Sequence, residues 1–330
     1  MARSHLTLAA LATSAVAGLD VAAAAPLSSG AAGDFDAAVL TARDGRHLLV
    51  RVPRSARAEA EQSADLVALR ALSAGVRARL PFAVSAFIGQ APAGQTRAVV
   101  TEFVYGHSLR LDALAHPHAD SIGRAVAAIH ALPASFVADS GMPARSAGEA
   151  LRACVSVMDR AAATGLVPPV LLRRWEDGTT DQQLWQFQPT VINGALGAAS
   201  FLFQEEHVSG VLGWQALSVG DPAQDLHWLL GSRTEGVAES AFDAYRQVLG
   251  AGDRHLQRRA SLYYELELAK WLLHGTEQRS TEIVDDAVEL LTSLAESLRT
   301  DVMNPIAPQT MPTLAVHEVE DLLNRSERAV

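Results

Sequence analysis

The side chains best suited to chemistry lie in one stretch, residues 190–225. Its carboxylates could accept a proton or hold a metal ion, and they stand at two places. Glu205 and Glu206 fall at the tip of an expected hairpin, whereas Asp221 and Asp225 fall at the start of an expected helix. Asp followed by Pro is typical of a helix N-terminus. We therefore interpret Asp221 as a capping residue and Asp225 as a residue that holds nearby backbone.

Three elements must position this stretch. The sequence predicts a strand at residues 191–192, a loop bent by Gly194 and Gly197, and a hairpin that pairs residues 201–203 with residues 211–212. Trp214 follows, and then the motif Gly220-Asp221-Pro222-Ala223-Gln224-Asp225-Leu226. This frame resembles the active-site segment of the aminoglycoside/macrolide phosphotransferase family, whose fold is that of protein kinases. The family pattern runs His-Gly-Asp-x-x-x-x-Asn, an apolar strand, a second strand ending Ile-Asp-Trp, and Gly-Asp-Pro-x-x-Asp-Leu.

The resemblance places four family positions on residues of another type. The family's His falls on Asn193, and its catalytic Asp, which accepts the proton of the substrate hydroxyl, falls on Ala195. The metal-holding Asn falls on Ser200, and the main Mg2+ ligand falls on Gly213. Alanine has no acceptor, and losing general-base help costs about 10²–10⁴ in rate. Magnesium prefers carboxylate oxygens, so we expect no metal site and no intact catalytic set.

A second part of the resemblance concerns a nucleotide. The positions that face the phosphates and the base in this family fall on seven residues: Gly30 and Gly33 in a turn, Arg51 on the third strand, its expected partner Asp65, and the hinge residues Glu102, Phe103 and Val104. The resemblance implies that ATP or GTP could bind here without Mg2+. An ordinary turn explains the two glycines equally well, and a solvated arginine at a strand edge is as good an explanation of Arg51.

The resemblance implies an α+β fold with two lobes, like that of protein kinases. Residues 1–104 are expected to form an N-lobe with a small antiparallel sheet: helices at 8–16 and 57–74, and strands at 21–27, 35–41, 47–52, 82–89 and 98–104. Residues 105–300 are expected to form a mostly helical C-lobe, with helices at 119–132, 146–164, 168–177, 226–231, 236–249, 253–275 and 280–298. We expect His130 to be a core histidine that bonds backbone near residue 193. Tyr263, Tyr264, Trp271 and Leu272 are expected in the core.

The last part of the chain differs in character. Residues 304–312 hold three prolines and are expected to be a linker. Residues 314–325 predict a short amphipathic helix, with leucine and valine on one side and acidic residues on the other. This helix could pack on its own lobe or bind a protein partner.

Composition limits the classes of protein that fit. The chain has 330 residues, of which 49% are hydrophobic and 19% charged, so it can bury a sizeable core. Its net charge of −10 argues against binding nucleic acid or a membrane surface. Cys154 is the only cysteine, which excludes an internal disulfide. Residues 1–26 imitate a secretory signal peptide, but Asp20 interrupts the pattern, so we favour a helix and a strand there and expect a cytoplasmic protein.

Three hypotheses of function follow. The first is a pseudokinase of this family, which binds a nucleotide, or a small hydroxylated or cationic molecule in a groove of the C-lobe, with little or no phosphoryl transfer. The second is an interaction protein that holds a partner. The third is an active macrolide/aminoglycoside-type small-molecule kinase with a rewired site. The sequence favours the first two, because no carboxylate replaces the missing working residues.

Overall fold

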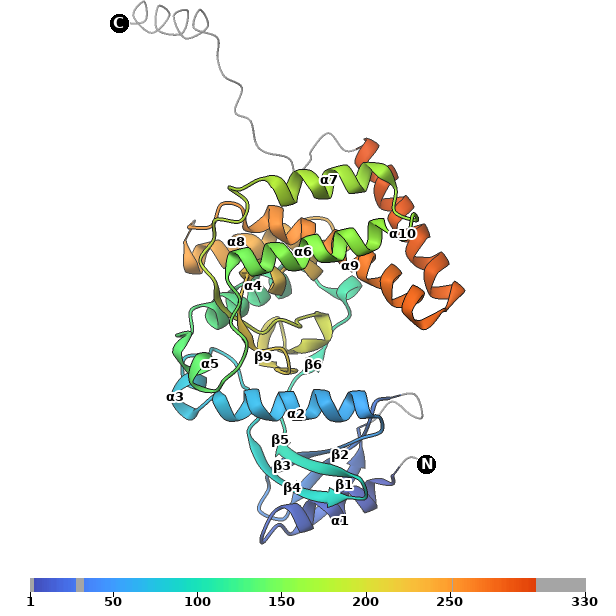
Figure 1. The fold of residues 1–330 in the computed structure, drawn as a ribbon. Coiled ribbons are helices and arrows are strands. Elements are labelled where there is room, and N and C mark those ends of the chain that lie inside the picture. The colour runs from blue at the N-terminus through green and yellow to red at the C-terminus, as the bar shows by residue number, and fades with distance from the viewer. Residues whose placement is uncertain (1–2, 28–32, 251, 301–330) are drawn as a thin grey trace, which may run out of the picture.

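The computed structural model describes residues 3–27, 33–250 and 252–300, which form two lobes (Figure 1). The N-lobe contains an antiparallel sheet with the strand order β1-β2-β3-β5-β4. The elements of this lobe are α1 (His5–Ala15), β1 (Val21–Pro26), β2 (Phe35–Ala42), β3 (His47–Pro53), α2 (Ala56–Ala71), α3 (Ala74–Arg77), β4 (Phe87–Ala93) and β5 (Thr96–Glu102).

The N-lobe sheet has one well-covered face. Residues along β2 and β3 alternate between buried and half-buried, as expected when one side of a sheet packs on a core. That core joins Leu40 and Val50 of the sheet to Leu8 and Ala12 of α1. The helix and strand expected near the N-terminus are therefore both present.

Helix α2 runs between the two lobes (Figure 1). Its residues Ala68 and Leu69 belong to the hydrophobic core of the C-lobe. On the other side, Gln62 donates through Nε2 to the carbonyl of Arg97 in β5 at 3.2 Å. Because α2 contacts both lobes, a group that it carries can bridge them.

The prediction of a strand at residues 82–89 is wrong for the first half of this range. The structure starts β4 at Phe87, and Phe82 and Val84 are buried in the C-lobe core instead. Ala83 donates its N–H to the carbonyl of Ser209 at 2.9 Å, and its own carbonyl accepts from Val211 at 3.1 Å. The segment thus pairs with a C-lobe strand, which an alternating apolar pattern cannot distinguish from pairing within the N-lobe sheet.

The C-lobe is mostly helical and surrounds two small sheets. Helix α4 packs on α8, and α9 packs on α6 and α10. The elements are β6 (His107–Ser108), η2 (Leu111–Ala113), α4 (His116–His130), α5 (Ser135–Asp139), α6 (Ala147–Ala162), α7 (Pro169–Thr180), β7 (Thr190–Ile192), η3 (Ala198–Ser200), β8 (Phe201–Gln204), β9 (His207–Val211), β10 (Ser218–Gly220), η4 (Pro222–Asp225), η5 (His227–Gly231), α8 (Val237–Leu249), α9 (Leu256–Gln278) and α10 (Thr281–Thr300).

Two further predictions for the C-lobe need correction. The helix expected from Pro222 onward is 3-10 in both of its parts, with a bond from the N–H of Leu226 to the carbonyl of Ala223 at 3.3 Å. Trp271 was expected in the core but is 37% exposed, where it stacks on His274 and donates to Asp286 at 2.7 Å. The interhelical bond of the indole N–H explains why this large side chain stays at the surface. Among the described residues, no helix is long and apolar enough to cross a membrane.

The linker and helix expected at residues 301–330, and the turn residue Gly30, lie outside the residues that the structure describes.

Candidate functional site

Asp225 fixes the loop that follows β7. Its carboxylate is fully buried and accepts the backbone N–H groups of Asn193 and Gly194, each at 2.7 Å. His130 contacts the same carboxylate through Nε2 at 3.2 Å and the Tyr245 hydroxyl through Nδ1 at 2.9 Å. His130 therefore reaches the loop through side chains, and the backbone bond expected for it is absent. The predicted role of Asp225 as a holder of this loop is confirmed.

Asn193 links the same loop to Gly213. Its Nδ2 donates to the carbonyl of Gly213 at 2.9 Å, and its Oδ1 accepts the N–H of Ala195 at 3.2 Å. The side chain is buried, and each of its two polar atoms has a partner. Asn193 thus acts as a structural clamp between two segments of the site.

The positions at which sequence analysis expected no catalytic or metal-binding side chain carry no carboxylate. Ala195 is exposed and presents a methyl group. The hydroxyl of Ser200 accepts the N–H of Gly197 at 3.2 Å, so it closes the loop. Gly213 has φ +76°, and an added Cβ there would lie 3.3 Å from Oε1 of Gln215. The neutral amide of Gln215 therefore stands beside the position where the resemblance places a metal-binding carboxylate.

These residues do not fit a magnesium ion. Magnesium needs hard oxygen ligands, usually one or two carboxylates. In the part of the chain that the structure describes, no group of three or more His, Cys, Asp or Glu side chains is arranged to hold a metal ion. Asp65, whose carboxylate bonds the N–H of Trp214 next to Gly213, also accepts from Arg51, so both of its oxygens already have protein partners.

Arg51 and Asp65 form the expected pair, and the pair extends across the lobes. Nη2 of Arg51 donates to Oδ2 of Asp65 at 3.0 Å, and the guanidinium lies 5.3 Å from the ring centre of Phe35. The other carboxylate oxygen of Asp65 accepts the N–H of Trp214 at 2.9 Å. Trp214 directly follows Gly213, so Asp65 of α2 links Arg51 of β3 to the Gly213 segment. Gly33 accepts a bond from Arg54 at 3.0 Å through its carbonyl.

Two of the three backbone N–H groups of the hinge are already bonded within the protein. The N–H of Glu102 donates to Ala86 at 2.8 Å, and the N–H of Phe103 donates to His47 at 3.1 Å. The carbonyl of Glu102 accepts the hydroxyl of Ser85 at 2.7 Å. Within the described residues the N–H of Val104 makes no hydrogen bond, so it is the hinge donor left for a ligand.

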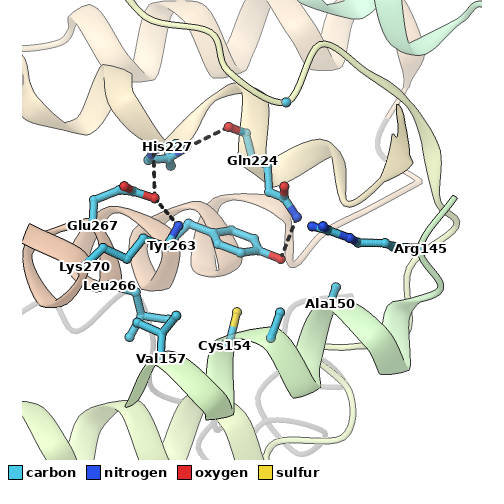
Figure 2. A pocket seen from close by; sticks show the side chains of 12 residues that line it. Arg145, Ala150, Cys154, Val157, Gln224, His227, Tyr263, Leu266, Glu267 and Lys270 are labelled. Carbon is cyan, nitrogen blue, oxygen red and sulfur yellow. Dashed lines mark hydrogen bonds and ion pairs between the residues drawn. The ribbon is translucent and has the colours of Figure 1, made fainter. Parts of the chain in front are cut away.

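A pocket opens in the C-lobe beside this loop (Figure 2). It encloses about 600 Å³ of empty space, part of it open to solvent, and Gly194 lies at its edge. The buried Asp221 caps η4 by accepting the N–H of Ala223 at 2.9 Å, as predicted. Asp221 also accepts from Arg259 at 2.8 Å and from the hydroxyl of Tyr263, a residue that lines the pocket, at 3.1 Å. Tyr263 is thus held in the pocket wall by a buried, bonded network.

Burial shifts the pKa of three side chains that line the pocket. Burial raises the pKa of the Cys154 thiol to about 12, so it stays a protonated, unreactive thiol. Burial also raises the pKa of Tyr263 well above its usual value, which keeps its hydroxyl a donor to Asp221. Burial lowers the pKa of His227 and favours the neutral ring.

Sequence analysis did not single out most residues of this pocket. Tyr263, Glu267 and Lys270 share helix α9, whereas Arg145 lies far from them in the sequence, and only the fold brings it to the same pocket. One signal was present, because Lys270 is the only lysine in the chain.

Known proteins share this architecture. The solved structures that resemble the chain include macrolide 2'-phosphotransferase MphH from Brachybacterium faecium, at 23% identity and a TM-score of 0.69, with 87% of this chain and 98% of that chain covered. A type I macrolide 2'-phosphotransferase is 23% identical with a TM-score of 0.68, covering 88% and 98%. The GDP complex of aminoglycoside 2'-phosphotransferase-IIIa is 16% identical with a TM-score of 0.71, covering 90% and 100%. These similarities establish the fold.

The family is established by a separate comparison. A search of curated proteins finds no match. The profile of the phosphotransferase enzyme family matches residues 24–262, which is well over half of the sequence. The chain therefore belongs to the phosphotransferase enzyme family.

Proposed function

We propose that this protein is a pseudokinase of its family: it binds ATP or GTP between the lobes without Mg2+ and transfers little or no phosphate. The observation that carries the proposal is the environment of Gly213. Its carbonyl is clamped by Asn193 and the neutral amide of Gln215 stands beside it, while Ala195 offers no acceptor for a hydroxyl proton. Phosphoryl transfer depends on positioning and on neutralising phosphate charge, and both working carboxylates are missing.

Other features support retained nucleotide binding. Arg51 is fixed by Asp65 at 3.0 Å and provides a cation next to α2, and Val104 provides an unused hinge donor. The related aminoglycoside 2'-phosphotransferase-IIIa was solved as a GDP complex. A cation and a backbone donor suffice to hold a phosphate and a base, whereas catalysis requires more.

Thermal-shift titration with ATP and GTP, each with Mg2+ or with EDTA, tests this proposal. Ligand at about 100 times its dissociation constant should stabilise the fold by about 2.7 kcal/mol in either medium. Arg51→Gln should weaken that shift, whereas Arg43→Gln, which breaks an exposed pair with Asp20, should leave it unchanged.

Two results would refute the proposal. A shift that appears only with Mg2+ would reveal a metal site, and phosphorylation of kanamycin or a macrolide would show an active kinase with a rewired site. No shift with either nucleotide would refute the binding half of the proposal.

A further inference from the structure

The pocket of the C-lobe differs in charge from the chain as a whole. Two cations, Arg145 and Lys270, and one carboxylate, Glu267, line it, although the chain has a net charge of −10. Gly194 connects its edge to the loop that carries Ala195. A pocket with more positive than negative side chains, on a protein with a net negative charge, favours an anionic ligand over a cationic one.

Arg145 has a fixed backbone and an unused side chain. Its N–H donates to the carbonyl of Val219 at 2.8 Å, which anchors it to β10 just before α6 begins. Its guanidinium makes no hydrogen bond or ion pair with the rest of the described chain, and Figure 2 shows it pointing toward the side chains of Gln224 and Tyr263. The nearby Glu149 is already used to cap α6, where Ser146 donates its N–H to it at 2.8 Å. The guanidinium is therefore free to bind a ligand.

The opposite wall holds the second cation. Nζ of Lys270 lies 2.5 Å from Glu267, but the two side chains are 49% and 43% exposed, so this surface pair is weak and an anion can compete for the ammonium. His227 adds no positive charge at neutral pH. Its Nδ1 is 2.8 Å from the carbonyl of Gln224, which places the proton on Nδ1, and its Nε2 faces Glu267 at 4.0 Å.

Between these walls the lining is apolar. It consists of Ala150, Ala153, Cys154, Val157 and Leu266. An apolar surface with a few convergent polar groups is the usual form of a small-molecule site, and here the unpaired polar group is a cation.

We propose that this pocket binds a small anionic ligand, a carboxylate on a compact apolar body, with Arg145 as its charged anchor. The proposal goes beyond the proposed function, which concerns a nucleotide between the lobes, and it is tested independently of it. The anionic ligand takes the place of the cationic molecule that sequence analysis gave as one possible ligand of the C-lobe. A carboxylate would bridge the Arg145 guanidinium and the amide of Gln224, and its apolar body would lie along α6 and α9.

Two probes with the same apolar body and opposite charges test the proposal. Phenylbutyrate and phenylpropylamine share a phenylpropyl group, and their binding to the full chain can be measured by titration calorimetry. We expect phenylbutyrate to bind at least about tenfold more tightly than the amine, because a charge-assisted bond is lost with the wrong charge. Equal affinity, preference for the amine, or no binding of either probe at millimolar concentration would overturn the proposal.

Variants of single charges sharpen the test. Arg145→Gln should weaken phenylbutyrate binding by about tenfold, and Glu267→Gln should strengthen it a few-fold. Arg152→Gln removes an exposed charge from α6, close in sequence to Arg145 but outside the pocket, and serves as the matched control. If Arg145→Gln and Arg152→Gln behave alike, Arg145 is not the anchor. Nucleotide binding should be equal in all of these variants, so failure of the nucleotide titration refutes the proposed function alone.

Discussion

Replacing Asp225 with alanine would remove the carboxylate that holds the loop after β7. This side chain is fully buried and accepts the N–H groups of Asn193 and Gly194 at 2.7 Å each. It also contacts Nε2 of His130 at 3.2 Å. All of these partners would lose their acceptor together, so the variant tests whether the scaffold depends on this one group.

The expected loss follows from the three contacts. A hydrogen bond to a charged group contributes about 1.5–3 kcal/mol, and a buried donor left without a partner costs about 1–3 kcal/mol. Gly194 is only half-buried, so water can recover part of its bond. We therefore expect Asp225→Ala to lower the free energy of unfolding by about 4 kcal/mol, near the value for breaking a buried ionic contact. Asp225→Asn keeps one acceptor oxygen and should cost about 2 kcal/mol.

Urea denaturation followed by tryptophan fluorescence measures these differences. Asp177 is exposed and makes no side-chain hydrogen bond within the described residues, so Asp177→Asn should change stability by less than about 0.5 kcal/mol. The melting temperature of Asp225→Ala should fall by roughly 10 °C. A loss below about 1 kcal/mol would refute the reasoning, because it would mean that the loop does not need its buried acceptor.

Three other changes have defined outcomes. Gly213→Asp places a carboxylate beside Gln215, at a φ of +76° that Asp tolerates. The affinity for ATP in EDTA should fall about tenfold, because the carboxylate repels the phosphates, and it should recover with Mg2+. If calorimetry finds no change in EDTA, Gly213 lies away from the phosphates. Burial lowers the pKa of His227 in the folded chain below its usual 6.5. As the pH falls below 6.5, the unfolded chain therefore binds a proton at His227 before the folded chain does, and the free energy of unfolding decreases. His227→Asn should flatten the acid slope of stability in urea titrations, and an unchanged slope would contradict the assignment. Gly123→Ala puts a Cβ 2.1 Å from a carbonyl of α8 and should cost about 1–3 kcal/mol in urea denaturation, whereas the exposed Gly148→Ala should be neutral or stabilising.

The parts of the site that sequence analysis predicted are those with local or motif-like causes. The cap at Asp221 follows from the Asp-Pro pair, whereas the pairing of Arg51 with Asp65 follows from the family positions on which these residues fall. The two-lobed fold follows from the same resemblance. Each of these depends on residues close in sequence or on a spacing that the family fold fixes.

The errors concern interactions between the lobes and between distant helices. Ala83 bonds the C-lobe strand β9, although Phe82 and Val84 alternate as a sheet strand would. Nothing in the sequence around Trp271 indicates that Asp286, on the next helix, would accept its indole N–H and keep it at the surface. In both cases a contact with another element decides between two arrangements that the local sequence pattern cannot distinguish.

The contacts that hold the loop after β7 do not involve the side chain at position 195, where the family has its catalytic carboxylate. Asp225 and Asn193 hold the loop through backbone groups, so the loop keeps its shape whether or not residue 195 carries a carboxylate. Ala195 is exposed and its methyl group takes no part in these bonds. A carboxylate at that position would add nothing to the bonds that hold the loop, so a well-preserved fold is no evidence for catalysis. The charges on Arg51 beside Asp65 and on Arg145 in the pocket are for this reason the better guide to what the protein binds.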